Sequence, residues 1–143
     1  MSGSKVPSNL YPSLTYDDAP AAIEWLCRVF GFEKRLVVPN GAGGVLHSEL
    51  SLGPGVIMVS SPRPDERRFG PRRFDGRSFG LAVYVEDPDA HHAKAAAAGA
   101  KILRPLRDEE YGARGYMVED CEGLGWYFAD YVPGAHWADG DAG

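Results

Sequence analysis

A histidine and a glutamate share one face of a predicted strand over residues 45–52. His47 and Glu49 are two positions apart, and the side chains of a β-strand alternate between its two faces. The opposite face carries Leu46 and Leu50, which suit packing on a helix, so we expect His47 and Glu49 to point toward a cavity. An imidazole beside a carboxylate could be an acid/base pair acting on a bound molecule, or two ligands of a metal site. Two ligands alone hold a catalytic metal poorly.

Arginines are concentrated in the segment Ser61–Ser78. Such a segment can be a solvated linker, a flap whose guanidinium groups clamp an anionic ligand, or a surface that faces a partner. The sequence leaves these three interpretations open. The arginines are Arg63, Arg67, Arg68, Arg72, Arg73 and Arg77.

The composition is that of a packed globular chain. Hydrophobic residues make up 44% of the 143 residues and charged residues 24%, and the formal net charge of −5 disfavours nonspecific binding to nucleic acid. No stretch has the length of a membrane span, and Met1–Pro7 has no apolar run typical of a signal peptide. We therefore expect a soluble cytoplasmic protein that binds neither nucleic acid nor membrane. No dinucleotide fingerprint or phosphate-binding glycine loop is present.

The same order of secondary-structure elements is predicted twice along the chain. Tyr16–Ala22 recurs 68 positions later as Tyr84–Ala90, and each copy opens a helix that is expected to end at a glycine. We predict two βαβββ modules in a single domain of residues 1–143. The predicted strands cover residues 9–16, 33–38, 45–52, 56–60, 80–85, 102–103, 115–119 and 125–131. Module one covers about residues 9–60, the linker 61–78, module two about 79–131, and a flexible tail 132–143.

Two stretches resemble the vicinal oxygen chelate superfamily, which includes glyoxalases, extradiol dioxygenases and bleomycin-resistance proteins. The first is Tyr16–Phe32. The second is Tyr111–Trp126, which contains Cys121 where the family usually has proline. The resemblance implies an α+β fold of two glyoxalase/bleomycin-resistance-like βαβββ modules, whose curved mixed sheets enclose a cavity. It also implies that this cavity is often completed in a homodimer.

The resemblance further implies where metal-dependent members place four ligands, usually His and Glu. Carried over to this chain, those positions hold Tyr11, Met58, Gly80 and Tyr127. None is a good ligand for a divalent cation: glycine has no side chain, a thioether is soft and neutral, and a phenol with a pKa of about 10 is mostly protonated at pH 7. We therefore expect neither a metal nor another cofactor.

If these four positions point into the cavity, strand alternation brings further side chains with them. A wall of tyrosines and methionine suits stacking on a planar aromatic guest, with His47, Glu49 and Arg114 fixing its orientation. No catalytic residue is predicted. The predicted ligand-binding residues are Tyr11, Ser13, His47, Glu49, Met58, Tyr84, Arg114, Tyr116 and Tyr127.

The missing ligand set favours a metal-free protein of the bleomycin-resistance type. Such a protein would bind and sequester an aromatic or antibiotic-like small molecule, and so serve in antibiotic resistance. The alternative is a glyoxalase-like lyase, isomerase or dioxygenase with an altered metal site involving His47 and Glu49. We also expect a homodimer, because each module exposes one curved sheet that the family buries by pairing modules.

Overall fold

The computed structural model describes residues 8–135 and 137. Met1–Pro7 lies outside the described residues, as do residues 136 and 138–143 of the tail that the sequence predicts to be flexible. The chain forms two compact units. Unit 1 is the chain up to Ser78 together with Asp120–Leu124, and unit 2 is Phe79–Glu119 together with the chain from Gly125 onward.

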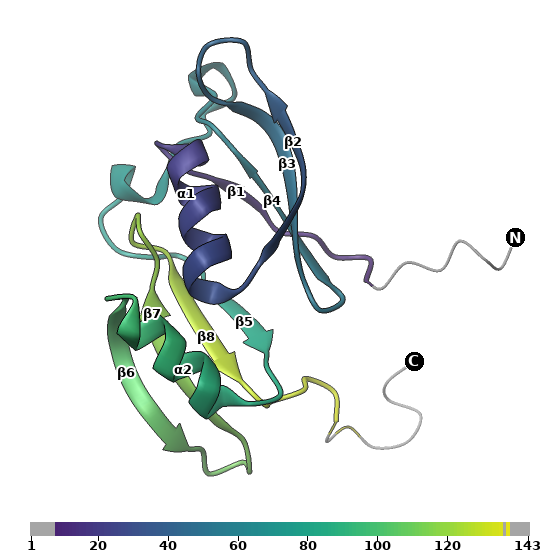
Figure 1. Ribbon diagram of the computed structural model, residues 1–143, viewed down its shortest axis with the longest axis vertical. Helices are drawn as coiled ribbons and strands as arrows, with labels where there is room; N and C mark the ends of the chain where they lie inside the picture. Colours follow the sequence, from purple (N-terminus) through teal and green to yellow (C-terminus); the bar gives the residue numbers. More distant parts are fainter. Residues whose placement is uncertain (1–7, 136, 138–143) are drawn as a thin grey trace, which may run out of the picture. The chain divides into compact units, whose positions relative to one another are not determined.

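Unit 1 is a βαβββ module followed by a long loop (Figure 1). Its elements are β1 (Ser13–Thr15), α1 (Ala19–Trp25), η2 (Leu26–Phe30), β2 (Glu33–Pro39), β3 (Val45–Leu52) and β4 (Gly55–Ser60). The sheet order is β1-β4-β3-β2, with β1 parallel to β4 and the other neighbours antiparallel. The first strand is shorter than the predicted 9–16, since Pro12 has no N–H to donate to a ladder.

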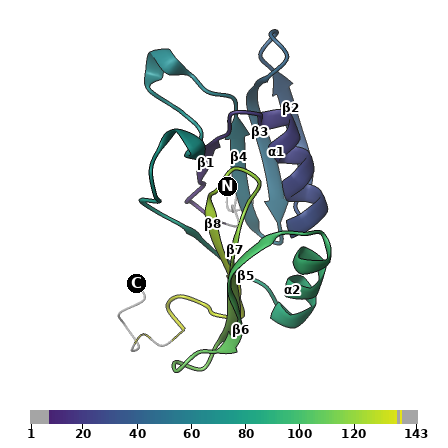
Figure 2. The ribbon, with the colours of Figure 1, turned by 90° about the vertical axis from the view of Figure 1, so that its left-hand side faces the viewer.

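The helical segment of unit 1 is capped by Asp18 and ends at a glycine, as the sequence predicts for its end. Oδ1 of Asp18 accepts the N–H of Ala21 at 3.1 Å, and Gly31 ends the helical segment at a φ of 89°, a conformation that glycine adopts cheaply. The apolar side of this segment, with Leu26 and Phe30, is buried as α1 lies along one face of the sheet (Figure 2). The other face is therefore left to carry a site.

Unit 1 also includes a turn from much later in the chain, residues 120–124. The hydroxyl of Tyr16 donates to Oδ2 of Asp120 at 2.6 Å, and the carboxylate of Glu122 accepts the N–H groups of residues 17 and 18 at 2.7 and 2.9 Å. Burial, and then the charge of Asp120, raise the pKa of Tyr16, so this hydroxyl stays protonated as a donor. The two stretches that carry the family resemblance thus meet in one hydrogen-bond network.

Unit 2 repeats the module. Asp87 caps α2 by accepting the N–H of Ala90 at 3.0 Å, and Gly99 follows the helix with a φ of 85°. The sheet order is β5-β8-β7-β6, the same arrangement as in unit 1. Its elements are β5 (Leu81–Tyr84), α2 (Pro88–Ala97), β6 (Lys101–Asp108), β7 (Arg114–Glu119) and β8 (Gly125–Ala129).

One strand of unit 2 is much longer than predicted. The sequence predicts a strand near residues 102–103, but β6 extends over Lys101–Asp108 and includes Pro105. β6 is an edge strand, where proline is tolerated, and its register shifts between Arg104 and Arg107. Within residues 8–135 and 137, none of the helices has the length and apolar character that crossing a membrane requires.

Candidate functional site

Unit 1 contains a pocket of about 240 Å³ where β1, β3 and β4 meet. β1 and β4 lie side by side here, with Ser13 opposite Met58 in the parallel register. The wall combines apolar side chains with hydroxyls, an imidazole and two guanidinium groups. The lining residues are Ser13, Leu46, His47, Met58, Val59, Ser60, Arg63 and Arg68.

The pocket lies at an interruption of the β3–β4 ladder. Regular pairing of these strands runs only from Leu52 opposite Gly55 to Leu50 opposite Ile57. Beyond it, the buried hydroxyl of Ser48 donates to the carbonyl of Val59 at 2.6 Å and accepts the N–H of Val59 at 3.1 Å. A side chain thus takes the place of a backbone partner, and the backbone groups remain satisfied.

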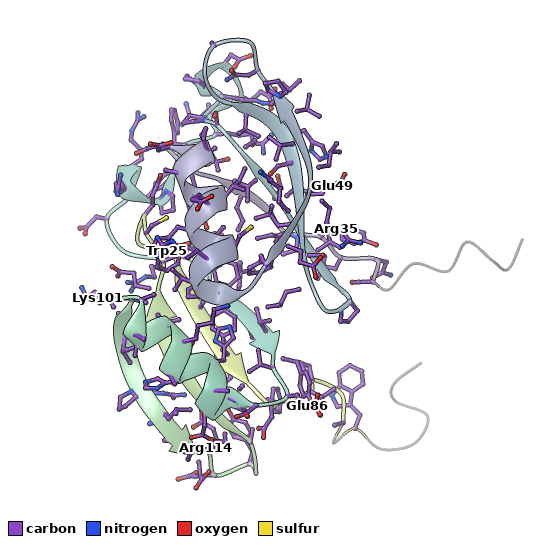
Figure 3. All side chains as sticks on the ribbon, viewed as in Figure 1. Trp25, Arg35, Glu49, Glu86, Lys101 and Arg114 are labelled. Carbon is purple, nitrogen blue, oxygen red and sulfur yellow. The ribbon has the colours of Figure 1, made fainter. Side chains whose placement is uncertain are left out.

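His47 and Glu49 lie beside each other on β3, as strand alternation predicts. Nε2 of His47 is 2.8 Å from Oε2 of Glu49, and their side chains are 39% and 43% exposed. Glu49 projects from β3 on the side away from α1 (Figure 3). Both side chains are partly open to water, which weakens the interaction between them, and their geometry suits a hydrogen bond to a guest as well as it suits acid/base work.

The arginine-rich segment 61–78 folds onto unit 1 through two short turns, η3 (Pro64–Glu66) and η4 (Pro71–Arg73). Nη2 of Arg63 donates to the carbonyl of Leu46 at 2.7 Å, and Nη2 of Arg68 donates to Oγ of Ser13 at 3.0 Å. Two further arginines of the segment donate to the carbonyls of residues 121 and 123. The segment is therefore no free linker, and two of its arginines reach the pocket.

Arg114 and Tyr116, which the sequence analysis placed on a cavity wall, lie instead at the helix of unit 2. Tyr116 pairs with Phe128 across β7 and β8, is fully buried, and holds its hydroxyl 2.6 Å from Nδ1 of His91 on α2. Arg114, labelled in Figure 3, donates two hydrogen bonds of 2.9 and 3.0 Å to the carboxylate of Asp89 on α2. Strand alternation puts both side chains on the helix-covered face, so we assign them to holding α2 on the sheet.

Tyr127 lies on the opposite face of that sheet, in a network that the sequence analysis missed. Its hydroxyl donates to Oε2 of Glu109 at 2.8 Å, and Glu109 also accepts bonds from Arg104 at 2.5 Å and Arg107 at 2.8 Å. Burial alone would raise the pKa of Glu109, but these hydrogen bonds lower it to about 2. Burial, the hydroxyl of Tyr111 and the Glu109 carboxylate raise the pKa of Tyr127.

The remaining predicted site residues are placed as follows. Tyr11 precedes β1 and donates to the carbonyl of Ser8, and Tyr84 on β5 is 53% exposed. Of the nine predicted residues, Ser13, His47 and Met58 line the unit 1 pocket, and Glu49 is bonded to one of them. The pocket residues outside this set of nine are Leu46, Val59, Ser60, Arg63 and Arg68. Strand alternation places Ser60 on the same face as Met58, and the clustering of arginines in residues 61–78 is the sequence signal for the last two.

The four positions at which the family resemblance implies metal ligands do not fit a divalent cation. The phenol of Tyr127 is kept protonated by its raised pKa, and that of Tyr11 donates to a carbonyl. Gly80 has no side chain, and Met58 offers only a thioether. Within residues 8–135 and 137, no three His, Cys, Asp or Glu side chains gather into a possible metal site.

Known proteins resemble this chain in sequence and fold. The model of the Glyoxalase/Bleomycin resistance protein/Dioxygenase superfamily matches residues 10–128. TioX from Micromonospora sp. ML1 is 35% identical with a TM-score of 0.70, over 87% of this chain and 97% of TioX. A glyoxalase/bleomycin resistance protein from Streptomyces sp. CB03234 shares the fold, with 19% identity and a TM-score of 0.65 over 85% of this chain and 98% of its own. An uncharacterized protein of Mycobacterium bovis is 28% identical over 120 residues, 82% of this chain and 79% of the relative.

Proposed function

The chain belongs to the Glyoxalase/Bleomycin resistance protein/Dioxygenase superfamily, and we propose that it binds and sequesters a small molecule without using a metal ion. The observation that carries this proposal is the unit 1 pocket at the interrupted β3–β4 ladder. Met58, which occupies an implied metal-ligand position, lines this pocket as an apolar side chain. A thioether in this wall can contact a bound molecule but does not hold a divalent metal that would activate it, which favours a binding role.

The pocket wall indicates the kind of guest. Leu46 and Met58 offer apolar contact, and a thioether packs well against aromatic rings. Ser60, His47 and the two arginines make the wall mostly polar, so hydrogen-bonding groups would fix the orientation of a guest. The volume of about 240 Å³ is below the range of about 300–1,000 Å³ usual for such sites, so we expect the pocket to hold a one- or two-ring part of an aromatic or antibiotic-like compound.

We further propose that the protein works as a homodimer. Large apolar side chains are exposed on the helix-free face of the unit 2 sheet, among them Tyr84 at 53% and Met117 at 36%, with Tyr111 nearby in sequence at 49%. Exposed apolar side chains on one sheet face are typical of a surface that binds another protein chain, which supports the proposed homodimer.

The function is tested by thermal melting and metal analysis on the same purified sample. We expect planar aromatic compounds to raise the Tm of protein treated with EDTA, and divalent metal to stay far below one ion per chain. Two results would overturn the proposal. One is an aromatic library that raises the Tm in no case.

The other is about one tightly held ion per chain that is lost in His47→Ala or Glu49→Ala. That result would instead support an enzyme of the glyoxalase type with an altered metal site. Glu33→Ala is the matched control, because Glu33 is exposed on β2 and pairs only with its neighbour Arg35 among the described residues.

A further inference from the structure

We propose that Arg63 and Arg68 form a subsite for an oxyanion, a carboxylate or phosphate group carried by the small molecule in the unit 1 pocket. The inference rests on the proposed function and names the chemical class of its guest. Both arginines line the pocket and both come from the loop after β4. An arginine fork matches a carboxylate or a phosphate with two parallel hydrogen bonds.

The backbone holds the two arginines as a pair. The N–H of Arg63 donates to the carbonyl of Arg68 at 2.9 Å, and the N–H of Arg68 donates to the carbonyl of Arg63 at 3.0 Å. Residues that exchange both bonds stand directly opposite each other, so their side chains leave on the same side. Arg67 closes the loop with a φ of 57°. The two guanidinium groups are thus brought to one place by main-chain geometry.

Among the described residues, the ion pairs of Arg63 and Arg68 are to a single carboxylate. Both arginines share one carboxylate, that of Glu66, at 3.5 Å from Arg63 and 3.6 Å from Arg68. These separations exceed the 2.7–2.9 Å or so of a strong charge-assisted bond. The arginine side chains are only 29% and 33% exposed, whereas Glu66 is 50% exposed and can turn into water. Glu49, the carboxylate beside the lining residue His47, is bonded to that histidine.

Hydroxyl groups complete the proposed subsite. Nη2 of Arg68 donates to Oγ of Ser13 at 3.0 Å and to Oγ of Ser60 at 3.5 Å. Each hydroxyl accepts this bond with a lone pair and keeps its own proton, which it can donate to a ligand oxygen. The guanidinium is also held in place before the ligand arrives, so little side-chain entropy is lost on binding.

The test compares three probes of one shape by calorimetry on EDTA-treated protein: 2-naphthoate, 2-naphthyl phosphate and the neutral 2-naphthamide. We expect at least one oxyanion to bind about tenfold or more tightly than the amide, as for a charge-assisted hydrogen bond. Rising salt should weaken the oxyanion alone. If 2-naphthoate binds more tightly than 2-naphthyl phosphate, the result indicates a carboxylate guest, and the reverse order indicates a phosphate guest.

The variants are Arg63→Ala, Arg68→Ala and Arg68→Lys, with circular dichroism and Tm to check the fold. Both alanine variants should bring the oxyanion and the amide to within about twofold of each other, and lysine, which keeps the charge but not the fork, should fall between. Arg35→Ala is the matched control, because it removes one arginine from β2 that is paired with Glu33 outside the pocket. This control should leave the ratio of the oxyanion affinity to the amide affinity unchanged.

Equal binding of oxyanion and amide by the unmodified protein would overturn the subsite and leave the proposed function standing. So would a preference that survives in both alanine variants. Failure of all three probes would also overturn the subsite. It would overturn the proposed function as well only if the aromatic library raised the Tm in no case.

Discussion

The side chain of Ser48 takes the place of a strand partner for Val59. One hydroxyl bonds both the carbonyl and the N–H of Val59, at 2.6 and 3.1 Å, at a point where β3 and β4 are no longer paired. The strands meet again where the N–H of Ser61 donates to the carbonyl of Val45 at 2.9 Å. The pocket opens between these two places, so Ser48 is part of the reason that it exists.

Ser48→Ala should therefore lower the free energy of unfolding. The change leaves a buried carbonyl and N–H without their partner, which costs about 1–3 kcal/mol. Urea unfolding measures the loss. The control is Ser51→Ala on the same strand, which should stay within about 0.5 kcal/mol of the unmodified protein. Equal stability of both variants would mean that the Ser48 bridge does not support the fold.

Tyr16→Phe should also destabilise the protein, by about 1–3 kcal/mol, because it removes the bond to the buried carboxylate of Asp120. The measurement is again urea unfolding. Tyr84→Phe is the matched control, since Tyr84 is 53% exposed. A Tyr16→Phe variant as stable as this control would contradict the role given to the network around residues 120–124.

Glu109→Gln should change how stability depends on pH. The pKa of Glu109 falls from its ordinary 4.5 to about 2 in the fold, so the unfolded chain takes up the proton first as pH falls. The stabilisation is complete above about pH 4.5 and is lost as the pH falls toward 2. The variant should be less stable at pH 7 and should show a flatter loss over this window. The exposed neighbour variant Glu110→Gln should keep the original slope, and an unchanged slope in Glu109→Gln would contradict the assignment.

The fold was largely predictable because its signals are local. Asp18 and Asp87 cap the helices, Gly31 and Gly99 follow them, and these residue types favour those positions by their own chemistry. β3 was predicted at its observed bounds, from a run of alternating residues between two glycine turns. Membership of the superfamily followed from two motifs that meet only in the folded unit.

The site was less predictable because it depends on contacts between distant residues. Nothing near Arg68 in the sequence indicates that it bonds Ser13, 55 positions away. Strand alternation predicts which residues share a face but not which face the helix covers, so it does not indicate that Tyr116 lies on the α2 side. The bonds of Glu109 are not predicted because Arg104 and Arg107 lie beyond the predicted strand 102–103, on the part of β6 that only the structure shows.

The homodimer is a further prediction. Sedimentation velocity at micromolar concentration should give a mass near 31 kDa, twice the 15.5 kDa of one chain. Association of this kind buries exposed apolar side chains and should persist at high salt, because it does not depend on charge. A species of one chain mass throughout the concentration range would remove the dimer and leave the unit 1 pocket unaffected.

The most direct test of the central claim follows the methyl group of Met58 by NMR. The chain has three methionines, and Met117 on β7 of unit 2 is an internal control for Met58 on the pocket wall. With methyl-labelled methionine and EDTA-treated protein, titration with 2-naphthoate should shift the Met58 resonance saturably, because an aromatic ring lies against it, and leave Met117 in place. A Met58 resonance that stays fixed while the ligand binds, or that moves only after a divalent metal is added, would contradict metal-free binding in this pocket.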